Sequence, residues 1–510
     1  EDRQNNKKRQ DGNRELTKLN MSRKVCFLVS LLVVGVLLLI SGFVLLGLYD
    51  TIIHDKIKQE INLKQGGDIY NNWVEPPVPI YFQIYVFNLE NPQQFMNGGK
   101  PKVTQKGPYT YREHRKKGKI DYHVNDTVSY NEVRRFEFDR AMSVGSDDDN
   151  MTTINIPLVA IADIVRKEYP LIQELVELLL DWANESLVMD VTVNGILWGY
   201  EEPMIRKIKD LAQKLGHPLN ISDRFGLFSG QNNTDDGRYT IFTGVEDVSR
   251  FGVIDRWNGL RNLSYWTTDQ CNMINGTDGT IFPPFIDKSD ILYLFSTDIC
   301  RSIYVAYDED VTLKDIPMYR FVAPRSVFQT QNNSANKGFC TPPDNCLPDG
   351  LLNAENCKSG APVVFSQPNF LDADESVIKS VDGIKPVRED HQTYIDLDPN
   401  TGAALNVAKR LQVNILIQNV SFITPTKKLH KMYFPILWLN ESAALTDKLA
   451  DDFKKSVLTP MKILHGVEYG LIALGGLIVI MAILLLVFLK RKKKTELVDL
   501  TNEETKLVKD

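Results

Sequence analysis

Two uncharged apolar segments, one near each end of the chain, constrain its fold more than any other feature. They run from Val25 to Leu48 and from Leu471 to Leu489. At about 1.5 Å per residue, each is long enough to cross a hydrocarbon core about 30 Å thick. Because lipid offers no partners for backbone polar groups, each segment is predicted to be a membrane-spanning helix rather than a core helix of a soluble protein.

Basic residues beside these segments predict their orientation, because Lys and Arg near a span are retained in the cytosol. Arg23 and Lys24 precede the first segment, and basic residues at 490–494 follow the second. The predicted organisation is a cytosolic tail at 1–24, a span at 25–48, a lumenal or extracellular domain at 49–468, a span at 469–489 and a cytosolic tail at 490–510.

Two features near the N-terminus bear on this organisation. Residues 1–20 are polar and charged, as in a disordered tail or an upstream extension, so Met21 fits a natural start. A cleaved signal peptide is a weaker interpretation of the first apolar segment, which is long and has no clear small-residue cleavage site.

Glycosylation sequons test the topology independently, because Asn-x-Ser/Thr is modified only on the lumenal side of a membrane. Asn20 is the one sequon outside the predicted lumenal domain. The ten sequons inside it are Asn125, Asn150, Asn184, Asn220, Asn232, Asn262, Asn275, Asn332, Asn419 and Asn440. Their confinement between the two spans predicts a heavily glycosylated domain.

Motifs for catalysis are missing from the sequence. There is no Gly-x-Ser-x-Gly elbow, no His-Glu-x-x-His and no phosphate-binding Gly-x-x-x-x-Gly-Lys, and the seven His residues are scattered. A triad assembled from distant residues remains open. We nevertheless predict that the chain is not an enzyme and needs no cofactor. The net charge of -6 is mild, so nucleic acid is not predicted as a partner.

The six cysteines fall into two groups. Cys26 lies at the cytosolic end of the first span, where it is a candidate for palmitoylation or an inert apolar residue. The other five, Cys271, Cys300, Cys340, Cys346 and Cys357, lie in the lumenal domain. An oxidising compartment favours disulfides, and an odd number leaves one thiol over. Zinc ligation is the weaker alternative, because no second Cys-x-x-Cys or paired His completes a site.

Strand signals run through the lumenal domain. The aromatic and β-branched run from Ile80 to Leu89 predicts a buried strand that stops at Asn91-Pro92. Residues Lys119 to Asp139 predict a hairpin that turns near Asn125-Asp126. Further strands are predicted at Arg238–Phe242, Ser302–Tyr307, Met318–Val322, Pro362–Ser366 and Leu411–Ile417. The last of these alternates apolar residues with Gln412 and Asn414.

Two amphipathic helices are predicted between these strands. The first begins at Pro170, and a narrow acidic stripe of Glu174, Glu177, Asp181 and Glu185 lies opposite its wide apolar face. The second runs from Pro203 to a stop at Gly216. An amphipathic face usually packs in a core, and the alternative is that part of the first helix is a docking surface. The candidate partner-binding residues are Leu171, Ile172, Leu175, Leu178 and Leu179.

Several stretches of the lumenal domain are typical of one known family. They are Asn72-Trp73, Phe87-Asn88 with Asn91-Pro92, Gly107-Pro108-Tyr109-Thr110-Tyr111-Arg112, Leu197-Trp198-Gly199-Tyr200, Cys271-Asn272-Met273-Ile274-Asn275-Gly276-Thr277-Asp278, Ile299-Cys300-Arg301-Ser302, Ala408-Lys409-Arg410, and Pro435 with Leu439-Asn440-Glu441. In these stretches the chain resembles the scavenger receptor class B family, which includes the fatty-acid translocase. The resemblance implies a two-pass membrane protein with an α+β ectodomain, in which an antiparallel β-barrel core encloses an apolar tunnel and carries a membrane-distal helical bundle.

Within that family, the run from Asn336 to Pro362 is most similar to the lysosomal member in spacing and residue choice. The resemblance implies two disulfides, Cys300–Cys357 and Cys340–Cys346. Members with a third disulfide join the position of Cys271 to that of Gly338. Cys271 is therefore expected to be a free thiol, in agreement with the odd count.

The charge of the first predicted helix bears on its ligand. Residues 171–190 contain five carboxylates and no Lys or Arg, whereas fatty-acid-binding members present basic residues on their apical helices. Like charges disfavour an anionic ligand, so a protein partner fits better. Resemblance to the lysosomal member implies glucocerebrosidase as that partner, and the tunnel implies sterol, phospholipid or fatty acid as lipid ligands.

The C-terminal tail contains Glu503, Leu507 and Val508, which resemble an acidic dileucine sorting signal read by cytosolic adaptors. Val508 replaces the usual Leu or Ile. We therefore predict a receptor of the lysosomal or late-endosomal membrane that delivers a hydrolase and passes lipid. The alternative is a plasma-membrane scavenger receptor for lipoproteins, sterols or fatty acids.

Overall fold

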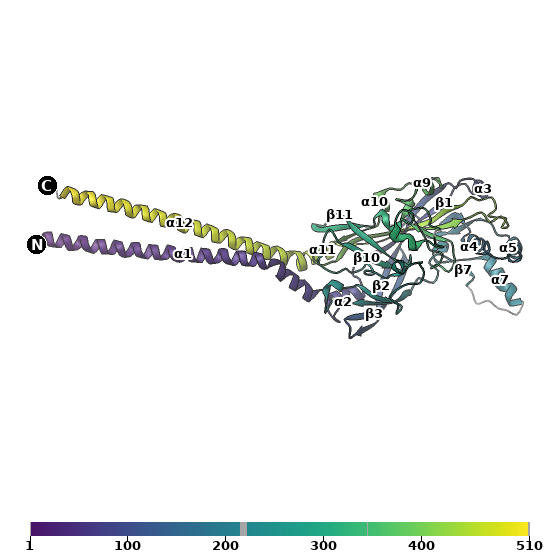
Figure 1. The fold of residues 1–510 in the computed structure, drawn as a ribbon, viewed down its shortest axis with the longest axis horizontal. Helices are drawn as coiled ribbons and strands as arrows, with labels where there is room; N and C mark the ends of the chain where they lie inside the picture. Colours follow the sequence, from purple (N-terminus) through teal and green to yellow (C-terminus); the bar gives the residue numbers. More distant parts are fainter. Residues whose placement is uncertain (1, 215–221, 344, 508–510) are drawn as a thin grey trace. The chain divides into compact units, whose positions relative to one another are not determined.

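The computed structural model describes residues 2–214, 222–343 and 345–507. It consists of two compact units (Figure 1), a helical unit of Glu1–Lys56 with Asp451–Asp510 and a central unit of Ile57–Ala450. Three residues of the predictions lie outside the described residues: Asn220, Gly216 and Val508. The side chains of Glu503 and Leu507 are likewise not described.

The helical unit contains the two predicted spans. They belong to α1 (Asp2–Glu60) and α12 (Thr459–Leu507), and α12 follows α11 (Asp447–Phe453) and a π-helical turn at Lys454–Leu458. Met21–Glu60 and Asp447–Glu496 are both long and apolar enough to cross a membrane. The helices approach closely at glycines, and a Cβ atom at Gly42 would lie 2.6 Å from Ile472. Small residues at such contacts are typical of paired membrane helices.

An antiparallel sheet of 13 strands forms the body of the central unit. Its main path runs in the order β10-β11-β12-β15-β16-β17-β1-β2-β3-β8-β9. These strands are β1 (Ile80–Leu89), β2 (Val103–His123), β3 (Thr127–Phe138), β8 (Thr234–Phe242), β9 (Ile254–Trp257), β10 (Ile291–Ser296), β11 (Arg301–Leu313), β12 (Ile316–Val322), β15 (Tyr394–Leu397), β16 (Ala404–Ile417) and β17 (Met432–Ala444). Off this path, β13 (Leu351–Asn353) pairs with β14 (Val363–Ser366), and β14 pairs with β16.

The strand predictions are confirmed. The first strand is observed at Ile80–Leu89 as predicted, and the hairpin turns between His123 and Thr127. The structure also shows that the polar side chains of β16, Gln412 and Asn414, are fully buried on the face opposite the apolar one. Gln412 donates to Asn414 (2.7 Å), and Asn414 donates to the Val364 carbonyl (3.0 Å), so both amides are satisfied beneath β14.

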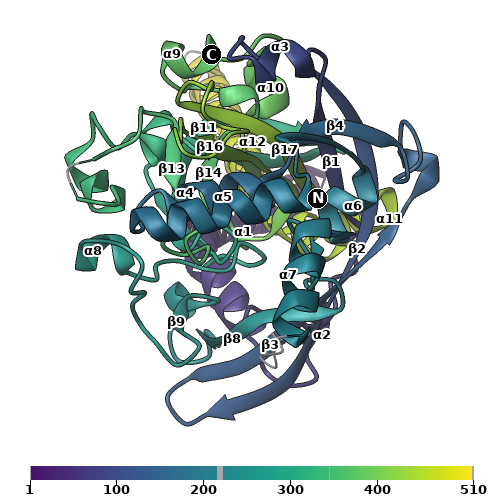
Figure 2. The same ribbon diagram turned by 90° about the vertical axis from the view of Figure 1, so that its right-hand side faces the viewer.

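Three helices gather at one end of the central unit (Figure 2), namely α4 (Ile156–Val165), α5 (Pro170–Ala183) and α7 (Pro203–Lys214). Prolines begin α5 and α7, where the missing N–H costs nothing. Asn184 ends α5 in the left-handed conformation (φ 57°). The contacts run from β16 to α4, from α4 to α5 and from α5 to α7, so α5 is one layer removed from the sheet.

The remaining elements of the central unit are short. The helices are α2 (Asp68–Val74), α3 (Pro92–Met96), α6 (Val193–Trp198), α8 (Asp269–Asn272), α9 (Glu375–Ile378) and α10 (Arg388–His391), with single turns at Arg140–Met142, Val248–Arg250, Arg325–Phe328, Ser334–Phe339 and Pro368–Phe370. Two small ribbons pair β4 (Asn150–Ile154) with β5 (Val188–Thr192) and β6 (Tyr200–Glu201) with β7 (Arg224–Phe225).

Two disulfides lie in the central unit, Cys300–Cys357 and Cys340–Cys346, and they are the pairs that the resemblance implies. Cys271 is buried and unpaired. A Cβ atom at Gly338 would lie 2.7 Å from the Cys271 sulfur, so a side chain at position 338 would meet this thiol directly. Cys26 is exposed on α1.

Candidate functional site

The apolar face of α5 is exposed rather than packed in the core. Leu171 keeps 78% of its surface accessible, Leu175 56% and Leu178 67%, whereas only Leu180 and Ala183 of this helix are buried. Of the other predicted anchors, Ile172 is exposed and Leu179 is half-buried. The interpretation of this face as a core surface is therefore wrong for most of the helix.

Part of the acidic stripe, by contrast, faces the body of the protein. Both carboxylate oxygens of Glu177 accept from the Thr424 backbone N–H at 3.2 Å. Glu185, just beyond the helix, is half-buried and accepts from the Asn155 amide at 2.8 Å. Glu177 and Glu185 are thus held inward, whereas the other two carboxylates of the stripe, Glu174 and Asp181, are exposed to solvent like the leucines.

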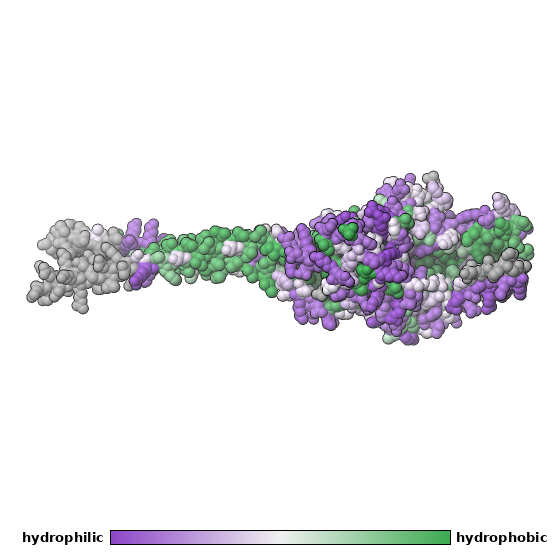
Figure 3. All heavy atoms as spheres, turned by 90° about the horizontal axis from the view of Figure 1, so that it is seen from below, coloured by the Kyte–Doolittle hydropathy of each residue, from purple (hydrophilic) through white to green (hydrophobic). Residues whose placement is uncertain are grey.

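Exposed side chains outside the predicted set extend this surface. Ile164 lies in the last turn of α4, Tyr169 precedes α5 and Trp182 lies in the last turn of α5, and they are 45%, 79% and 55% exposed. We define the α5 patch as Ile164, Tyr169, Leu171, Leu175, Leu178 and Trp182. Figure 3 shows hydrophobic side chains gathered at the end of the central unit where α5 lies. Clustered exposed apolar side chains are typical of an interaction surface.

A basic residue from another helix reaches the C-terminal end of α5. Lys207 of α7 donates to the Ala183 carbonyl (2.9 Å) and the Trp182 carbonyl (3.2 Å). Its Nζ also lies 5.3 Å from the Trp182 ring centre. Cations are favoured at helix C-termini. The composition of residues 171–190 does not show this cation, because Lys207 comes from the neighbouring helix α7.

A network of ion pairs crosses β2, β3, β16 and β17. Arg115 contacts Glu113 (2.8 Å), Glu132 (3.7 Å) and also Glu441. The network continues through the pairs Lys117–Glu132, Lys409–Glu441 (3.4 Å), Lys409–Asp298 (2.5 Å) and Arg134–Asp236 (3.1 Å). Glu113 and Lys117 are almost fully buried, whereas Lys409 and Asp298 keep about a third of their side-chain surface. We call this set the Arg115 network.

Burial and pairing act in opposite directions on the carboxyls of this network. Burial raises the pKa of Glu113, and the neighbouring Glu441 adds to the effect. Burial also acts to raise the pKa of Glu132, but Lys117 and Arg115 outweigh it and hold that pKa at about 2. Sequence reasoning missed the network. The sequence pattern that could have indicated the network is the alternation of Glu113, Arg115 and Lys117, which places three charges on one face of a strand.

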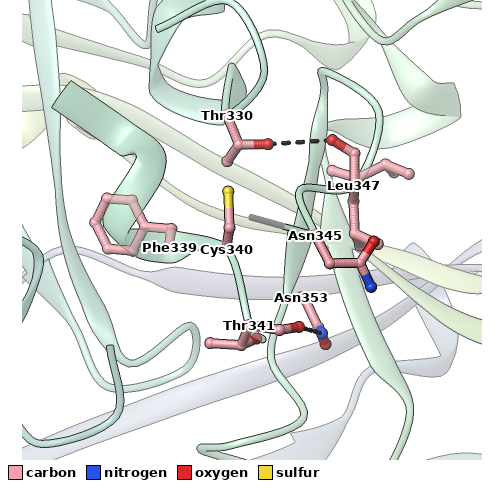
Figure 4. Close-up of a pocket in the computed structure, with 8 residues that line it drawn as sticks. Thr330, Phe339, Cys340, Thr341, Asn345, Leu347 and Asn353 are labelled. Atoms are coloured by element: carbon pink, nitrogen blue, oxygen red, sulfur yellow. Dashed lines mark hydrogen bonds between the residues drawn. The ribbon is translucent and has the colours of Figure 1, made fainter. Parts of the chain in front are cut away.

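A small pocket lies beside the Cys340–Cys346 disulfide (Figure 4). Two hydrogen bonds cross its walls, from Thr330 to the Leu347 carbonyl (3.2 Å) and from Asn353 to the Thr341 carbonyl (2.9 Å). The pocket is too small to hold a water molecule, so it is not a lipid site. Among the described residues, no group of three or more His, Cys, Asp or Glu could hold a metal ion.

The predicted sequons differ in accessibility. Asn125, Asn150, Asn184, Asn232, Asn262, Asn332 and Asn419 are exposed. Asn275 is half-buried, and so is Asn440, whose amide nitrogen donates to Gln83 at 2.9 Å across the sheet. Asn184 lies at the end of α5, so a glycan there would border the α5 patch.

Comparison with known proteins gives consistent matches over most of the chain. The CD36 family model matches residues 33–486. The chain is 36% identical to lysosome membrane protein 2 of Mus musculus and of Homo sapiens over 445 residues, which are 86% of this chain and 91% of each relative. It is also 36% identical to scavenger receptor class B member 1 of Sus scrofa over 446 residues, 87% of this chain and 86% of that protein.

Proposed function

The chain belongs to the CD36 family, and from that premise we propose that it is a receptor of the lysosomal or late-endosomal membrane. In this proposal the central unit lies in the lumen, binds a hydrolase through the α5 patch and delivers it. The exposed leucines of α5 are the observation that carries the proposal. Similarity to lysosome membrane protein 2 supports the location.

The partner that we propose is glucocerebrosidase, which would cover the leucines of α5 with a groove or a helix on its surface. An amphipathic helix binds a partner through apolar residues at spacings of three and four, and Leu171, Leu175 and Leu178 have this spacing. The anchored carboxylate of Glu177 fixes the helix on the body, so little conformational entropy is lost on binding. The patch is therefore suited to a protein surface of complementary shape.

We also propose that the main sheet closes into a barrel around a tunnel that passes sterol, phospholipid or fatty acid. The strands at the ends of its path, β9 and β10, are bridged by Gly276 and Thr277. Ile254 of β9 donates to the Gly276 carbonyl (2.9 Å), and Phe295 of β10 donates to the Thr277 carbonyl (2.9 Å). The rings of Trp257 and Phe295 lie 5.6 Å apart between the same two strands. These contacts support closure.

The sorting signal in the tail predicts the location of the full-length chain. Replacing Leu507 and Val508 with Ala is expected to move the protein from lysosomes to the cell surface, because the adaptor loses its apolar anchor while Glu503 remains. The measurement is quantitative surface labelling together with co-staining for a lysosomal marker.

The chain supplies a matched control for this experiment. Leu497 and Val498 form the same dipeptide in the same tail, but Lys493 stands four residues before Leu497 where the signal has Glu503. The Leu497→Ala, Val498→Ala variant should stay lysosomal. Surface location of both the parent and the Leu507 variant would contradict a working signal.

A second candidate function is a plasma-membrane scavenger receptor for lipoproteins, sterols or fatty acids. Similarity to scavenger receptor class B member 1, at the same identity of 36%, favours it. In this case the tunnel is the functional element and the α5 patch receives particles. Staining of unpermeabilised cells distinguishes the two candidates, because only the second predicts most of the parent chain at the surface.

A further inference from the structure

The turn between β10 and β11, at residues 297–300, is bonded to strands from both halves of the main sheet. The Thr297 hydroxyl donates to Asp236 of β8 at 2.5 Å. The next residue, Asp298, accepts from Lys409 of β16 at 2.5 Å. In the path of the sheet, β8 is the last strand but one, and β16 lies three strands from β11. The turn therefore meets strands that a flat sheet would hold far from it.

These contacts show which face of the sheet is concave. Neighbouring strands lie about 4.8 Å apart, so a flat sheet would separate β11 and β16 by about 14 Å. The side chains of Lys409 and Asp298 together do not span that distance, yet they are paired, so the face that carries Lys409 curves toward the turn. Glu441 of β17 lies directly opposite Lys409 in the register and shares this face. Val407 and Leu411, two positions before and after Lys409, give it an apolar border on either side.

The pair of Lys409 and Asp298 is the accessible part of the Arg115 network. Their side chains keep 33% and 29% of their surface, whereas that of Arg115 keeps 11%. Burial acts to raise the pKa of Asp298, but Lys409 and Arg134 outweigh it and hold that pKa below its usual range. Burial likewise acts to lower the pKa of Lys409, but Asp298 and Glu441 raise it. Both members of the pair are therefore charged, and part of each side chain is free to contact a ligand.

The charges of the Arg115 network are close to balanced, which bears on the charge of a ligand. The network contains four cations and five carboxyls, namely Arg115, Lys117, Arg134 and Lys409 with Glu113, Glu132, Glu441, Asp298 and Asp236. Burial raises the pKa of one of these carboxyls, Glu113, which brings the sum of charges nearer to zero. A ligand with a net charge would leave a charge unpaired on this concave face, and such a charge is costly when buried. A zwitterion keeps the balance.

We propose that Lys409 and Asp298 form a site inside the barrel for the head group of a zwitterionic phospholipid. The phosphate pairs with Lys409 and the ammonium with Asp298, so the ion pair opens without leaving either charge alone. The acyl chains lie on the apolar surface beside Val407 and Leu411. A fatty acid would take Lys409 from Asp298 and leave that carboxylate unpaired, and a sterol hydroxyl replaces neither partner. This inference selects one lipid class for the proposed tunnel and rests on that tunnel.

Photo-crosslinking of the full-length chain in maltoside micelles tests this, because it reports both the class of lipid and its position. The probes are phosphatidylcholine, palmitic acid and cholesterol at equal concentrations, each with a diazirine on its apolar part, and mass spectrometry locates the labelled peptides. In the parent, phosphatidylcholine should label β16 more strongly than the other two probes. In the Lys409→Met, Asp298→Asn variant this labelling should fall about tenfold, because both charged contacts are lost. Glu441 keeps its contact with Arg115 in this variant, so no charge is left alone there.

A single substitution should change the preference of the site rather than abolish binding. Asp298→Asn removes the carboxylate that competes for Lys409, so palmitic acid should then label β16 at least as strongly as phosphatidylcholine. The matched control is Lys288→Met, Asp310→Asn, which removes an ion pair of 2.7 Å whose side chains are 44% and 62% exposed. It should label like the parent.

The outcomes separate the head-group site from the tunnel. The head-group site is overturned, and the tunnel stands, if phosphatidylcholine labels β16 no more than the other probes do in the parent. The same conclusion follows if its labelling is undiminished in the Lys409→Met, Asp298→Asn variant, or if Asp298→Asn brings no shift toward palmitic acid. If none of the three probes labels any strand of the central unit, the tunnel is wrong and the head-group site with it.

Discussion

Replacing Leu175 and Leu178 with Gln in the full-length chain is expected to weaken glucocerebrosidase binding by about a thousandfold. Both side chains are more than half exposed and lie one turn apart in the α5 patch. Truncating a desolvated anchor costs about 2 kcal/mol, so two anchors lose about 4 kcal/mol, and each 1.4 kcal/mol is about tenfold in affinity. Gln keeps the helix propensity of Leu, so α5 itself should persist.

Surface plasmon resonance with purified chain and enzyme measures this effect, and circular dichroism checks the fold. The matched control is Leu260→Gln, Ile291→Gln. These two residues lie elsewhere on the central unit and are 56% and 54% exposed, similar to Leu175. The control should bind like the parent. If the parent and the α5 variant bind the enzyme with equal affinity while α5 is intact, the α5 patch is not the docking surface.

The second large effect is expected at Arg115, whose loss should lower the free energy of unfolding by about 3–5 kcal/mol. Arg115→Met keeps most of the side-chain volume but leaves Glu113 and Glu441 as buried carboxylates without their shared cation. Removing one partner from a buried ion pair costs this amount because the remaining charge stays desolvated. Denaturant unfolding of the full-length chain in detergent gives the difference.

Arg135→Met controls for the loss of an arginine from the same hairpin. Arg135 pairs with Glu137 at 3.1 Å, and both side chains are at least half exposed. Exposed pairs contribute about 0–1 kcal/mol, so this variant should unfold close to the parent. A similar small change for Arg115→Met would mean that the Arg115 network does not hold the strands together.

The Arg115 network should also remain charged in an acidic compartment, at least at Glu132. Its pKa of about 2 lies below the value of about 4.3 in the unfolded chain, so its stabilising contribution is complete above the unfolded value. That contribution is lost only as the pH falls toward 2.

Local patterns in the sequence predicted the strands and helices well, because each depends on a few neighbouring residues. The run of β-branched and aromatic residues marked β1 from Ile80 to Leu89, and Pro170 marked the start of α5. The family resemblance covered the same domain and is consistent with the large antiparallel sheet. The two apolar segments predicted the two candidate membrane helices.

Contacts between residues far apart in the sequence could not be predicted from these local patterns. The amphipathic pattern of α5 predicted two faces but could not decide which faces outward. That choice depends on Glu177 meeting Thr424, which lies 247 positions away in the sequence. The position of the basic Lys207 at the end of α5 likewise depends on the packing of α7 beside α5.

The most direct test of the central claim is the fraction of cellular glucocerebrosidase that reaches lysosomes. It should be measured in cells that lack family members of the lysosomal type, after expression of the parent chain or the Leu175→Gln, Leu178→Gln variant. The account predicts that the parent restores lysosomal enzyme and that the variant, although itself lysosomal, does not. Equal delivery by both chains, or delivery by neither, would contradict a hydrolase receptor that acts through α5.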